Sequence, residues 1–236
     1  MSPLLTSTTV ACADLTQADI QAMFDIFSEN FCGATIDIFQ RDLCSKNWVI
    51  LLRDEENGEL EGFSTLALYE ASFQNQPLSV VYSGDTIIRP VYWGTPELPR
   101  SWIKTVIEKS AQMPKPLYWL LISSGYKTYR FLTVFYQEFY PCCDMPTPPE
   151  SQALMDHLAL QRFGADYHPE LGVVRFTEGA TPLRDGVAEV TDARLLDRHV
   201  AFYLARNPGH IQGDELVCLT RVHPDNFTAA GRRVFR

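Results

Sequence analysis

The sequence predicts an α+β fold, an α/β sandwich in which a mixed, mostly antiparallel sheet is flanked by helices. Its 236 residues are enough to bury one substantial core without disulfide bonds. Through residues 1–140, segments with a hydrophobic period of 3.6 alternate with segments of period 2, in the order α-α-β-β-β-α-β-α. Because a helix joins the third and fourth strands, these two strands should run parallel within an otherwise antiparallel sheet.

Two helices are expected first. Apolar residues recur at helical spacing from Ile20 to Phe31, which predicts an amphipathic helix with Thr16 as its N-cap. A second helix is expected after Gly33, with its apolar face centred on Phe39.

A meander of three antiparallel strands should follow. Residues 48–53 form an apolar run that indicates a buried strand, and residues 54–59 have the composition of a hairpin turn. The next strands are expected at 60–69 and 78–89, separated by a turn at 74–77.

The next helix should begin beside Thr95. Thr95 suits an N-cap, Pro96 the first helical position and Glu97 the first turn, and the helix should end before Pro114. Residues 117–123 are intensely apolar, as in a strand covered on both faces.

The remaining elements carry weaker signals. A proline-rich stretch at 141–149 interrupts the chain, so we divide it into a core at 1–145 and a C-terminal α/β extension at 146–236 that completes the sheet and a binding site. The elements expected after residue 123 are helices at 127–140, 151–163 and 193–205 and strands at 171–176 and 215–222.

The charge and composition exclude several classes of protein. A net charge of -9 argues against nucleic acid or an anionic membrane surface as the main partner, and 46% hydrophobic residues argue against disorder. Residues 1–150 hold 10 basic and 18 acidic side chains, whereas residues 151–236 hold 10 and 11. The negative charge thus lies almost wholly in residues 1–150, which would suit a cationic partner.

Cysteine usage and the N-terminus point to the cytoplasm. The six cysteines form no CxxC pair and are too sparse for a disulfide scaffold. Residues 1–10 lack the basic and apolar regions of a signal peptide, and no apolar run approaches the roughly 18 residues of a membrane span. We therefore expect a cytoplasmic protein without a membrane span.

Two segments resemble the GNAT acyltransferase superfamily. Residues 88–94, Ile-Arg-Pro-Val-Tyr-Trp-Gly, resemble the family's strand-end sequence V-x-P-x-x-x-G, which leads into the loop that holds the pyrophosphate of acyl-CoA. Residues 135–140 resemble the xYxxxGF pattern of a late family helix. The resemblance implies an acyl-donor site at Ile87, Ile88, Arg89, Tyr92, Trp93, Gly94, Thr95, Glu97 and Leu98.

The chain departs from the family in this loop. Two further family glycines fall on Pro96 and Leu98, and both Pro96 and Pro99 lack the N–H group that an anion would accept from a helix N-terminus. Either acyl-CoA binds through altered contacts, or an acyl carrier protein brings the donor, or transferase activity has been lost. Residues 95–97 would equally suit the ordinary start of a helix.

Transfer of an acyl group from a thioester to an amine requires a base, a group that donates a hydrogen bond to the oxyanion, and an acid. No Ser-His-Asp order or Cys-His pairing is visible, so direct attack of an amine on a thioester needs the fewest groups. The resemblance implies that Tyr136 protonates the leaving thiolate and that the backbone near Ile87 and Ile88 binds the oxyanion. Tyr136 would also suit a core aromatic.

The base is expected among a few titratable side chains. Asp85 lies on a predicted strand just before the loop, where an apolar setting would raise its pKa, although a surface carboxylate is the alternative. His168 and His210 are loop histidines that a C-terminal site or the solvent would accommodate equally. No histidine–carboxylate spacing indicates a metal site, and we expect no metal.

These observations predict an N-acyltransferase that moves an acyl group to a primary amine. A crowd of aromatic residues after the loop would line a pocket for a medium or long acyl chain, or simply fill the core. The resemblance extends to fatty-acyl peptide maturases, which makes a lysine or ornithine side chain of a peptide the candidate acceptor. The alternative is a non-catalytic GNAT-fold module that binds a peptide or acyl ligand. The aromatic residues are Tyr118, Trp119, Tyr126, Tyr129, Phe131, Phe135, Tyr136, Phe139 and Tyr140.

Overall fold

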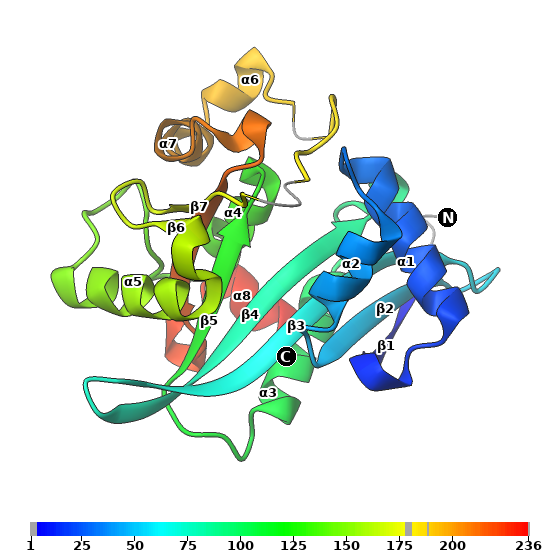
Figure 1. The fold of residues 1–236 in the computed structure, drawn as a ribbon, viewed down its shortest axis with the longest axis horizontal. Coiled ribbons are helices and arrows are strands. Elements are labelled where there is room, and N and C mark those ends of the chain that lie inside the picture. The colour runs from blue at the N-terminus through cyan, green and yellow to red at the C-terminus, as the bar shows by residue number, and fades with distance from the viewer. Residues whose placement is uncertain (1–3, 178–180, 188, 236) are drawn as a thin grey trace.

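A computed structural model describes residues 4–177, 181–187 and 189–235 (Figure 1). Within these residues the strands form one eight-stranded sheet in the order β1-β2-β3-β4-β5-β8-β7-β6. Among the strands of the described residues, only β4 and β5 pair in parallel, as the helix between them predicts, so the expected mixed and mostly antiparallel sheet is confirmed. The strands are β1 (Leu5–Ala11), β2 (Trp48–Asp54), β3 (Leu60–Phe73), β4 (Gln76–Ile88), β5 (Leu117–Ser123), β6 (Tyr167–His168), β7 (Val173–Val174) and β8 (Glu215–Arg221).

Helices cover both faces of the sheet (Figure 1). One face carries the first two helices and, farther along the sheet, α5; the other carries α3, α4 and α7. The helices are α1 (Gln17–Asn30), α2 (Ile36–Leu43), α3 (Glu97–Lys109), α4 (Tyr126–Phe135), α5 (Pro149–Phe163), α6 (Asp192–Leu195), α7 (Arg198–Arg206) and α8 (Ala229–Val234). No helix among the described residues is long and apolar enough to cross a membrane.

Local sequence explains where the first helix begins. The Thr16 hydroxyl accepts from the backbone N–H of Asp19, and the Asp19 carboxylate accepts from the backbone N–H of Thr16, which completes a capping box. The N-cap expected at Thr16 is therefore confirmed.

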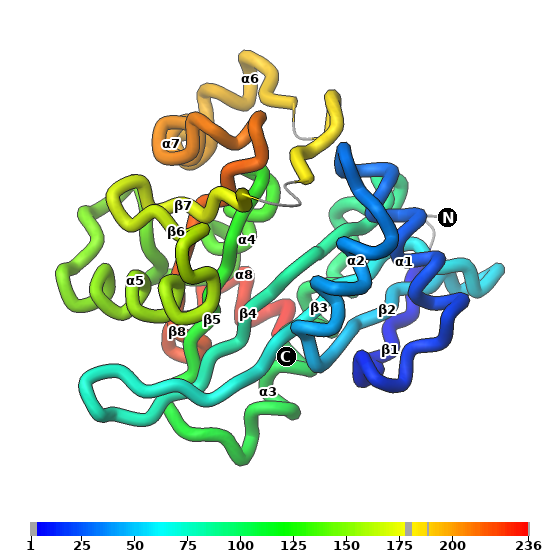
Figure 2. The backbone as a smooth tube through the Cα atoms, in the orientation of Figure 1, coloured from blue at the N-terminus to red at the C-terminus, as the bar shows by residue number. Residues whose placement is uncertain are grey.

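The C-terminal segment joins the same sheet. Figure 2 shows β8, near the end of the chain, beside β5 from its middle, and the register pairs Leu121 with Cys218. The strands β7 and β6 then extend the sheet to its far edge.

Several expected elements differ from the structure. The meander of three antiparallel strands is confirmed as β2, β3 and β4, but residues 5–11 form an additional edge strand, β1, that was not predicted and that pairs with β2. This strand was missed because it is half-exposed and rich in threonine and serine. The strand expected at 171–176 contains only Val173–Val174, and the helix expected at 193–205 is split into α6 and α7.

Two helix ends also differ. The helix expected to reach residue 140 ends at Phe135, because Tyr136 is extended and pairs with Phe227, outside the helix. The N-cap predicted at Thr95 was wrong, since α3 begins at Glu97 after Pro96 and the Thr95 hydroxyl is buried without a hydrogen-bond partner among the described residues.

Candidate active site

The parallel strands separate at their carboxyl ends. The pairing of β4 with β5 stops at Ser83 and Leu121, whereas β4 continues to Ile88 beside β3. Beyond this point β5 keeps only its antiparallel neighbour, with Ser123 opposite Leu216 of β8. Figure 1 shows the two strands diverging. In the described part of the chain, the end of β4 therefore has a strand on one side only, which leaves backbone groups available to a ligand.

A β-bulge lies in this open part of β4. The register shifts between Ser64 and Leu66 of β3, so that Gly84 and Asp85 together oppose Thr65. A bulge of this kind bends a strand and re-aims its side chains, and bulges are common beside active sites. The bulge places Asp85 at the point where the sheet opens.

Asp85 lies in an environment that favours its protonated form. It is two residues before Ile87, which packs in the core beneath α1 and α2, so its side chain is on that face of the sheet. Burial, together with repulsion from Asp42, raises the pKa of Asp85 to about 7, and the nearby ammonium of Lys46 opposes this rise. A carboxyl with this pKa exchanges protons readily at neutral pH, as a general base must.

A second carboxyl shares this environment. Glu215, the first residue of β8, has its pKa raised to about 8 by burial first, and then by repulsion from Asp85 and Asp42. A hydrogen bond with Ser124 and the charge of Lys46 act in the opposite direction. We refer to Asp42, Lys46, Asp85 and Glu215 as the acidic cluster.

Lys46 is the single cation of the acidic cluster. Its side chain is buried, and its Nζ lies 2.7 Å from both carboxylate oxygens of Asp42. A Cβ atom on Gly84 would lie 2.5 Å from the Lys46 Cε, so the glycine provides the space that the lysine occupies. Because Asp85 and Glu215 can both ionise near neutral pH while the Lys46 ammonium is paired with Asp42, the cluster can hold a further cation once these two carboxyls lose their protons.

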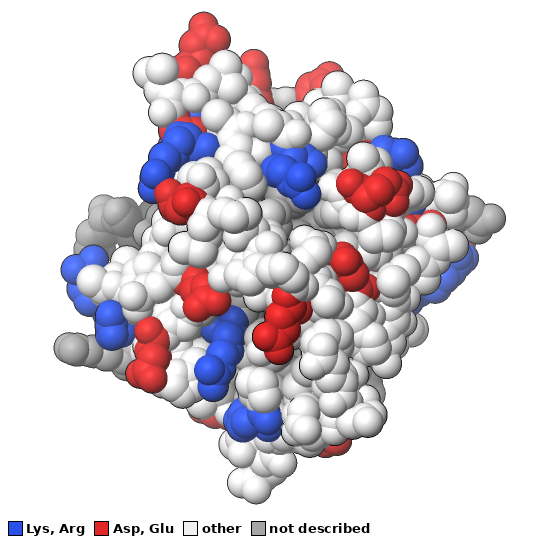
Figure 3. All heavy atoms as spheres, turned by 90° about the vertical axis from the view of Figure 1, so that its left-hand side faces the viewer, with Lys and Arg blue, Asp and Glu red and all other residues white. Residues whose placement is uncertain are grey.

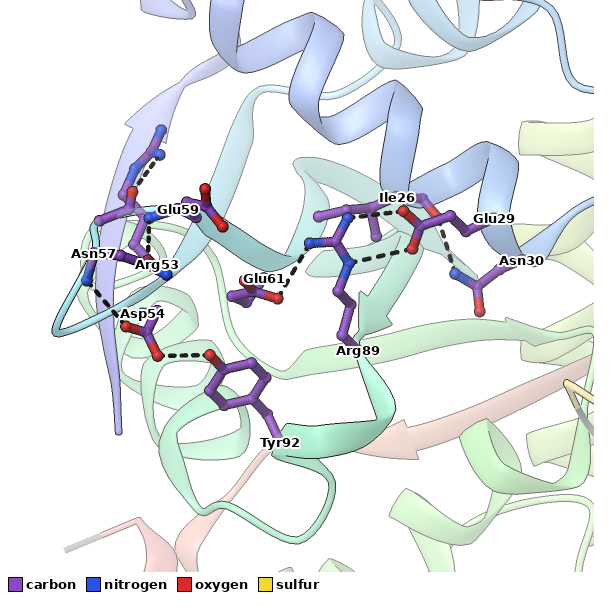
Figure 4. A network of polar contacts seen from close by, with 11 residues as sticks. Ile26, Glu29, Asn30, Arg53, Asp54, Asn57, Glu59, Glu61, Arg89 and Tyr92 are labelled. Carbon is purple, nitrogen blue, oxygen red and sulfur yellow. Dashed lines mark hydrogen bonds and ion pairs between the residues drawn. The ribbon is translucent and has the colours of Figure 1, made fainter. Parts of the chain in front are cut away.

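The side chains of two residues in the predicted donor loop are directed at other parts of the protein. Figure 4 shows Arg89 directed at Glu29 of α1, with one N–O distance of 2.7 Å, and at Glu61 of β3, at 3.2 Å. In the same view the Tyr92 hydroxyl donates to Asp54 over 2.6 Å, a bond that is buried. These contacts fasten the loop to α1 and to the hairpin between β2 and β3.

The loop also uses some of its own backbone donors. The N–H of Trp93 donates to the Pro90 carbonyl at 3.1 Å, and the N–H of Thr95 donates to the Tyr92 carbonyl at 3.2 Å. Of the predicted donors, those without an acceptor among the described residues are the N–H groups of Gly94, Glu97 and Leu98.

One predicted oxyanion donor faces the opening between the strands. The N–H of Arg89 donates to the Glu61 carbonyl of β3, and successive residues of an antiparallel strand point their backbone groups in opposite directions. The N–H and carbonyl of Ile88 therefore point away from β3, whereas those of Ile87 point toward it. The Trp93 indole N–H donates to the Ile88 carbonyl over 2.9 Å, in agreement with this orientation.

Tyr136 lies on the opposite face from Asp85. It is buried next to Trp119 and Phe227, with ring centroids 5.7 and 5.6 Å away. Its hydroxyl has no hydrogen-bond partner among the described residues, and burial raises the pKa of this phenol. The structure thus places Tyr136 and Asp85 on two sides of the sheet, and the role of Tyr136 stays a prediction.

His168 is not brought to Asp85. It belongs to β6 at the far edge of the sheet, and three strands separate β6 from β4. Its Nδ1 lies 3.5 Å from Glu170.

Sequence reasoning missed the other members of the acidic cluster. Asp42 and Lys46 are spaced i, i+4 at the end of α2, a spacing typical of helix ion pairs and visible in the sequence. Glu215 is the first residue of an apolar strand, and only the folded structure shows that it lies near Asp85.

The aromatic residues fill the core. Trp102 and Trp119 pack at 4.4 Å between ring centroids, and Tyr129 contacts both Phe139 and Tyr203. Two cavities, of about 460 and 860 Å³, lie at the opposite, amino-terminal end of β5. Most of the rings thus pack in the core, whereas Tyr118, Phe139 and Tyr140 line the larger cavity.

Comparisons with known proteins give similarities of fold. No protein-family model and no curated protein matches this sequence. A probable N-acyltransferase from Enterococcus faecalis is similar over 58% of this chain and 33% of its own, at 14% identity and a TM-score of 0.41. The GNAT family N-acetyltransferase YhbS of Escherichia coli, solved in complex with CoA, is similar over 56% of this chain and 70% of its own, at 14% identity and a TM-score of 0.38.

The N-myristoyltransferase of Saccharomyces cerevisiae, solved with bound myristoyl-CoA, is similar over 51% of this chain and 29% of its own, at 14% identity and a TM-score of 0.41. This chain thus spans about a third of the Enterococcus and yeast proteins. At such identities and TM-scores the matches say what the chain is similar to and do not establish its activity.

Proposed function

We propose that this protein is an N-acyltransferase that moves an acyl group from acyl-CoA to a primary amine by direct attack. The observation that carries the proposal is the position of Asp85, a carboxyl with a pKa of about 7 at a bulge where β4 loses its parallel neighbour. Such a group can take a proton from an ammonium and leave a nucleophilic amine.

The two substrates would approach from opposite faces of the sheet. The acidic cluster lies on the face of α1, α2 and α5, whereas the predicted donor loop leads into α3 on the other face. The opening between β4 and β5 connects these faces. An ammonium attracted by the cluster would meet a thioester presented from the side of α3.

The reaction follows from these positions. Asp85 accepts a proton from the ammonium, and the free amine attacks the thioester carbon. The oxyanion accepts a hydrogen bond from the Ile88 N–H, which the open strand end leaves without a strand partner. The C–S bond then breaks, the nitrogen loses its second proton, and the thiolate gains one, so that an amide and free CoA result.

Tyr136 is proposed to protonate the leaving thiolate. It lies on the face of α3 and α4, from which the donor would approach, and its hydroxyl has no competing partner among the described residues. The variant Tyr136→Phe should slow thiol release while leaving acyl-CoA binding unchanged, and undiminished release would remove this assignment.

The acceptor is proposed to be a cationic amine such as a lysine or ornithine side chain of a peptide. Asp85 and Glu215 lose their protons near pH 7 and pH 8, and a bound cation would favour their ionised forms, so the acidic cluster suits a cationic acceptor better than an anionic one. Because the two cavities lie at the amino-terminal end of β5, away from Asp85, we do not extend the proposal to a long acyl chain.

The test is a panel of acyl-CoAs from acetyl to myristoyl, offered with lysine and ornithine peptides. We expect thiol release that depends on the peptide, and a mass increase of the peptide equal to the acyl group. An acyl carrier protein carrying the same acyl groups is a parallel arm that identifies a different donor. Absence of peptide acylation with every donor would overturn the proposal.

A binding module is the second candidate, and the donor loop favours it. Pro96 and Pro99 provide no N–H, and the Trp93 and Thr95 N–H groups are already bonded within the loop. In this case peptide or acyl-CoA would raise the melting temperature without any thiol release.

A further inference from the structure

Three side chains that could ligate a metal meet outside the proposed active site. Cys143 and Asp144 are neighbours in the loop after α4, and His199 is in the first turn of α7. One ligand atom from each lies within 4.8 Å of the others, and the Cys143 Sγ is 3.2 Å from the His199 Nδ1. We propose that Cys143, Asp144 and His199 bind a zinc ion.

The distances suit this ion. In a tetrahedral zinc site with Zn–S near 2.3 Å and Zn–N near 2.0 Å, the sulfur and nitrogen are about 3.5 Å apart. The Cys143 and His199 atoms are already close to this separation. Asp144 is exposed in a loop, so its carboxylate can complete the third position by a small side-chain rotation.

The donor types select among metals. A thiolate with an imidazole favours zinc over magnesium or calcium, which prefer oxygen ligands alone. Three protein ligands leave a fourth position for water. The Arg198 guanidinium lies 2.7 Å from one oxygen of Asp144 and would hold this carboxylate in place while its other oxygen binds the metal.

The ion would connect two parts of the chain. His199 is 56 residues from Cys143, so no sequence spacing indicates the site, and the expectation of no metal rested on spacing alone. A bound zinc would fasten the loop after α4 to α7, the helix that packs against α4. The site lies beyond β5 and β8 from Asp85, so it is independent of the proposed transfer reaction.

The test is a cobalt titration of the full chain after treatment with a chelator. We expect one equivalent of Co²⁺ to produce visible bands of a tetrahedral ion and a near-ultraviolet thiolate-to-cobalt band, both removed by Zn²⁺. Cys143→Ser should lose the thiolate band, and Asp144→Asn should weaken binding about ten-fold or more while keeping it.

The matched control is Cys142→Ser, which removes the adjacent thiol, whose Sγ is directed at the Met145 carbonyl. This variant should keep the spectrum and the rise in melting temperature on adding Zn²⁺, and Asp85→Asn should keep both as well. The absence of a thiolate band in the unmodified chain would overturn the proposal. An equal band in Cys143→Ser would also overturn it, because another cysteine would then hold the metal.

Discussion

At the scale of single residues, the chemistry depends on how burial and neighbouring charge act on two carboxyl groups. Asp85 and Glu215 both have pKa values raised to near neutrality, to about 7 and about 8. Lys46 opposes both shifts and is itself held by Asp42. The cluster thus keeps one acceptor of protons ready at neutral pH and retains an affinity for cations.

The pH profile of the reaction should report Asp85. A base acts in its deprotonated form, so kcat/KM for the amine should rise with pH through about 7 and then level off, until another group titrates. The measurement is thiol release under limiting amine between pH 5 and pH 9. A rate that is independent of pH across this range would contradict the assignment.

Glu215 should affect the acceptor more than the chemical step. At pH 9, above the pKa of about 8 of Glu215, replacing Glu215 with Gln removes one of the negative charges that attract the amine, so we expect KM for the amine to rise about ten-fold, equivalent to about 1.4 kcal/mol, with a smaller change in kcat. Glu108→Gln, an exposed site on α3, is the matched control. An unchanged KM would mean that Glu215 does not contribute to binding of the amine.

At the scale of the elements, a single hydroxyl fastens helix and strands at the point where the sheet opens. The Ser83 Oγ accepts hydrogen bonds from the indole N–H groups of Trp102 on α3 and Trp119 on β5, at 3.0 and 2.9 Å. Ser83 is also the last residue of β4 that pairs with β5. This junction therefore sets where the strands begin to separate.

Ser83→Ala should leave both indole groups buried without an acceptor. Each unpaired buried donor costs roughly 1–3 kcal/mol, so the two indole groups together should lower the free energy of unfolding by about 2–6 kcal/mol. Urea denaturation measures this loss. Ser28→Ala, at a part-exposed hydroxyl on α1, should change stability by less than about 0.5 kcal/mol. Equal losses in the free energy of unfolding for the two variants would mean that the Ser83 hydrogen bonds stabilise the fold no more than a part-exposed hydroxyl does.

The helices and strands also show which parts of the fold can be predicted from the sequence alone. Periodicity and crossover geometry predicted the parallel pair β4 and β5 and the helices on either side, because these signals are local and strong. The edge strand β1 was missed because half-exposed threonines carry a weak pattern. The end of α4 was missed because it is set by the pairing of Tyr136 with Phe227, a contact between distant parts of the chain.

The candidate site also contains one residue that the sequence could predict and others that it could not. Asp85 was identified from its position on a strand before a loop, which is a local feature. Glu215 and Asp42 reach it only through the strand order and the position of α2, so one sequence without its fold does not show them. The resemblance implies that Arg89 and Tyr92 belong to the acyl-donor site. In the structure their side chains contact Glu29 and Asp54, which lie outside the motif that carries the resemblance.

At the scale of the whole molecule, charge is distributed without a single dominant patch on the face that Figure 3 shows. Acidic and basic side chains are interspersed among uncharged residues there. On this face no charged patch would guide an amine, so the proposed local attraction rests on the acidic cluster.

The acidic cluster should make folding stability depend on pH. The folded pKa values of Asp85 and Glu215 are raised above their usual values of 3.8 and 4.5, so the folded protein binds more protons than the unfolded chain. The stability from these protonated carboxyls is complete below about pH 4 and is lost as pH rises through about 7 and 8. The loss is at most about 1.4 kcal/mol per pH unit for each proton.

Removing one carboxyl should reduce this dependence. The free energy of unfolding of Asp85→Asn, measured by urea denaturation from pH 5 to pH 9, should fall less with pH than that of the unmodified protein. Asp37→Asn, an exposed site on α2, should follow the unmodified curve. Parallel curves for Asp85→Asn and the unmodified protein would mean that the folded state does not raise the pKa of Asp85.

The central claim is that Asp85 takes the proton from the attacking amine, and the rate of amine-dependent thiol release in Asp85→Asn tests it most directly. Asparagine keeps the size of the side chain and cannot accept that proton, so the account predicts a loss of about 100-fold or more in kcat with acyl-CoA binding retained. The Asp37→Asn control should react at the unmodified rate. A rate for Asp85→Asn equal to that of the unmodified protein would contradict the account.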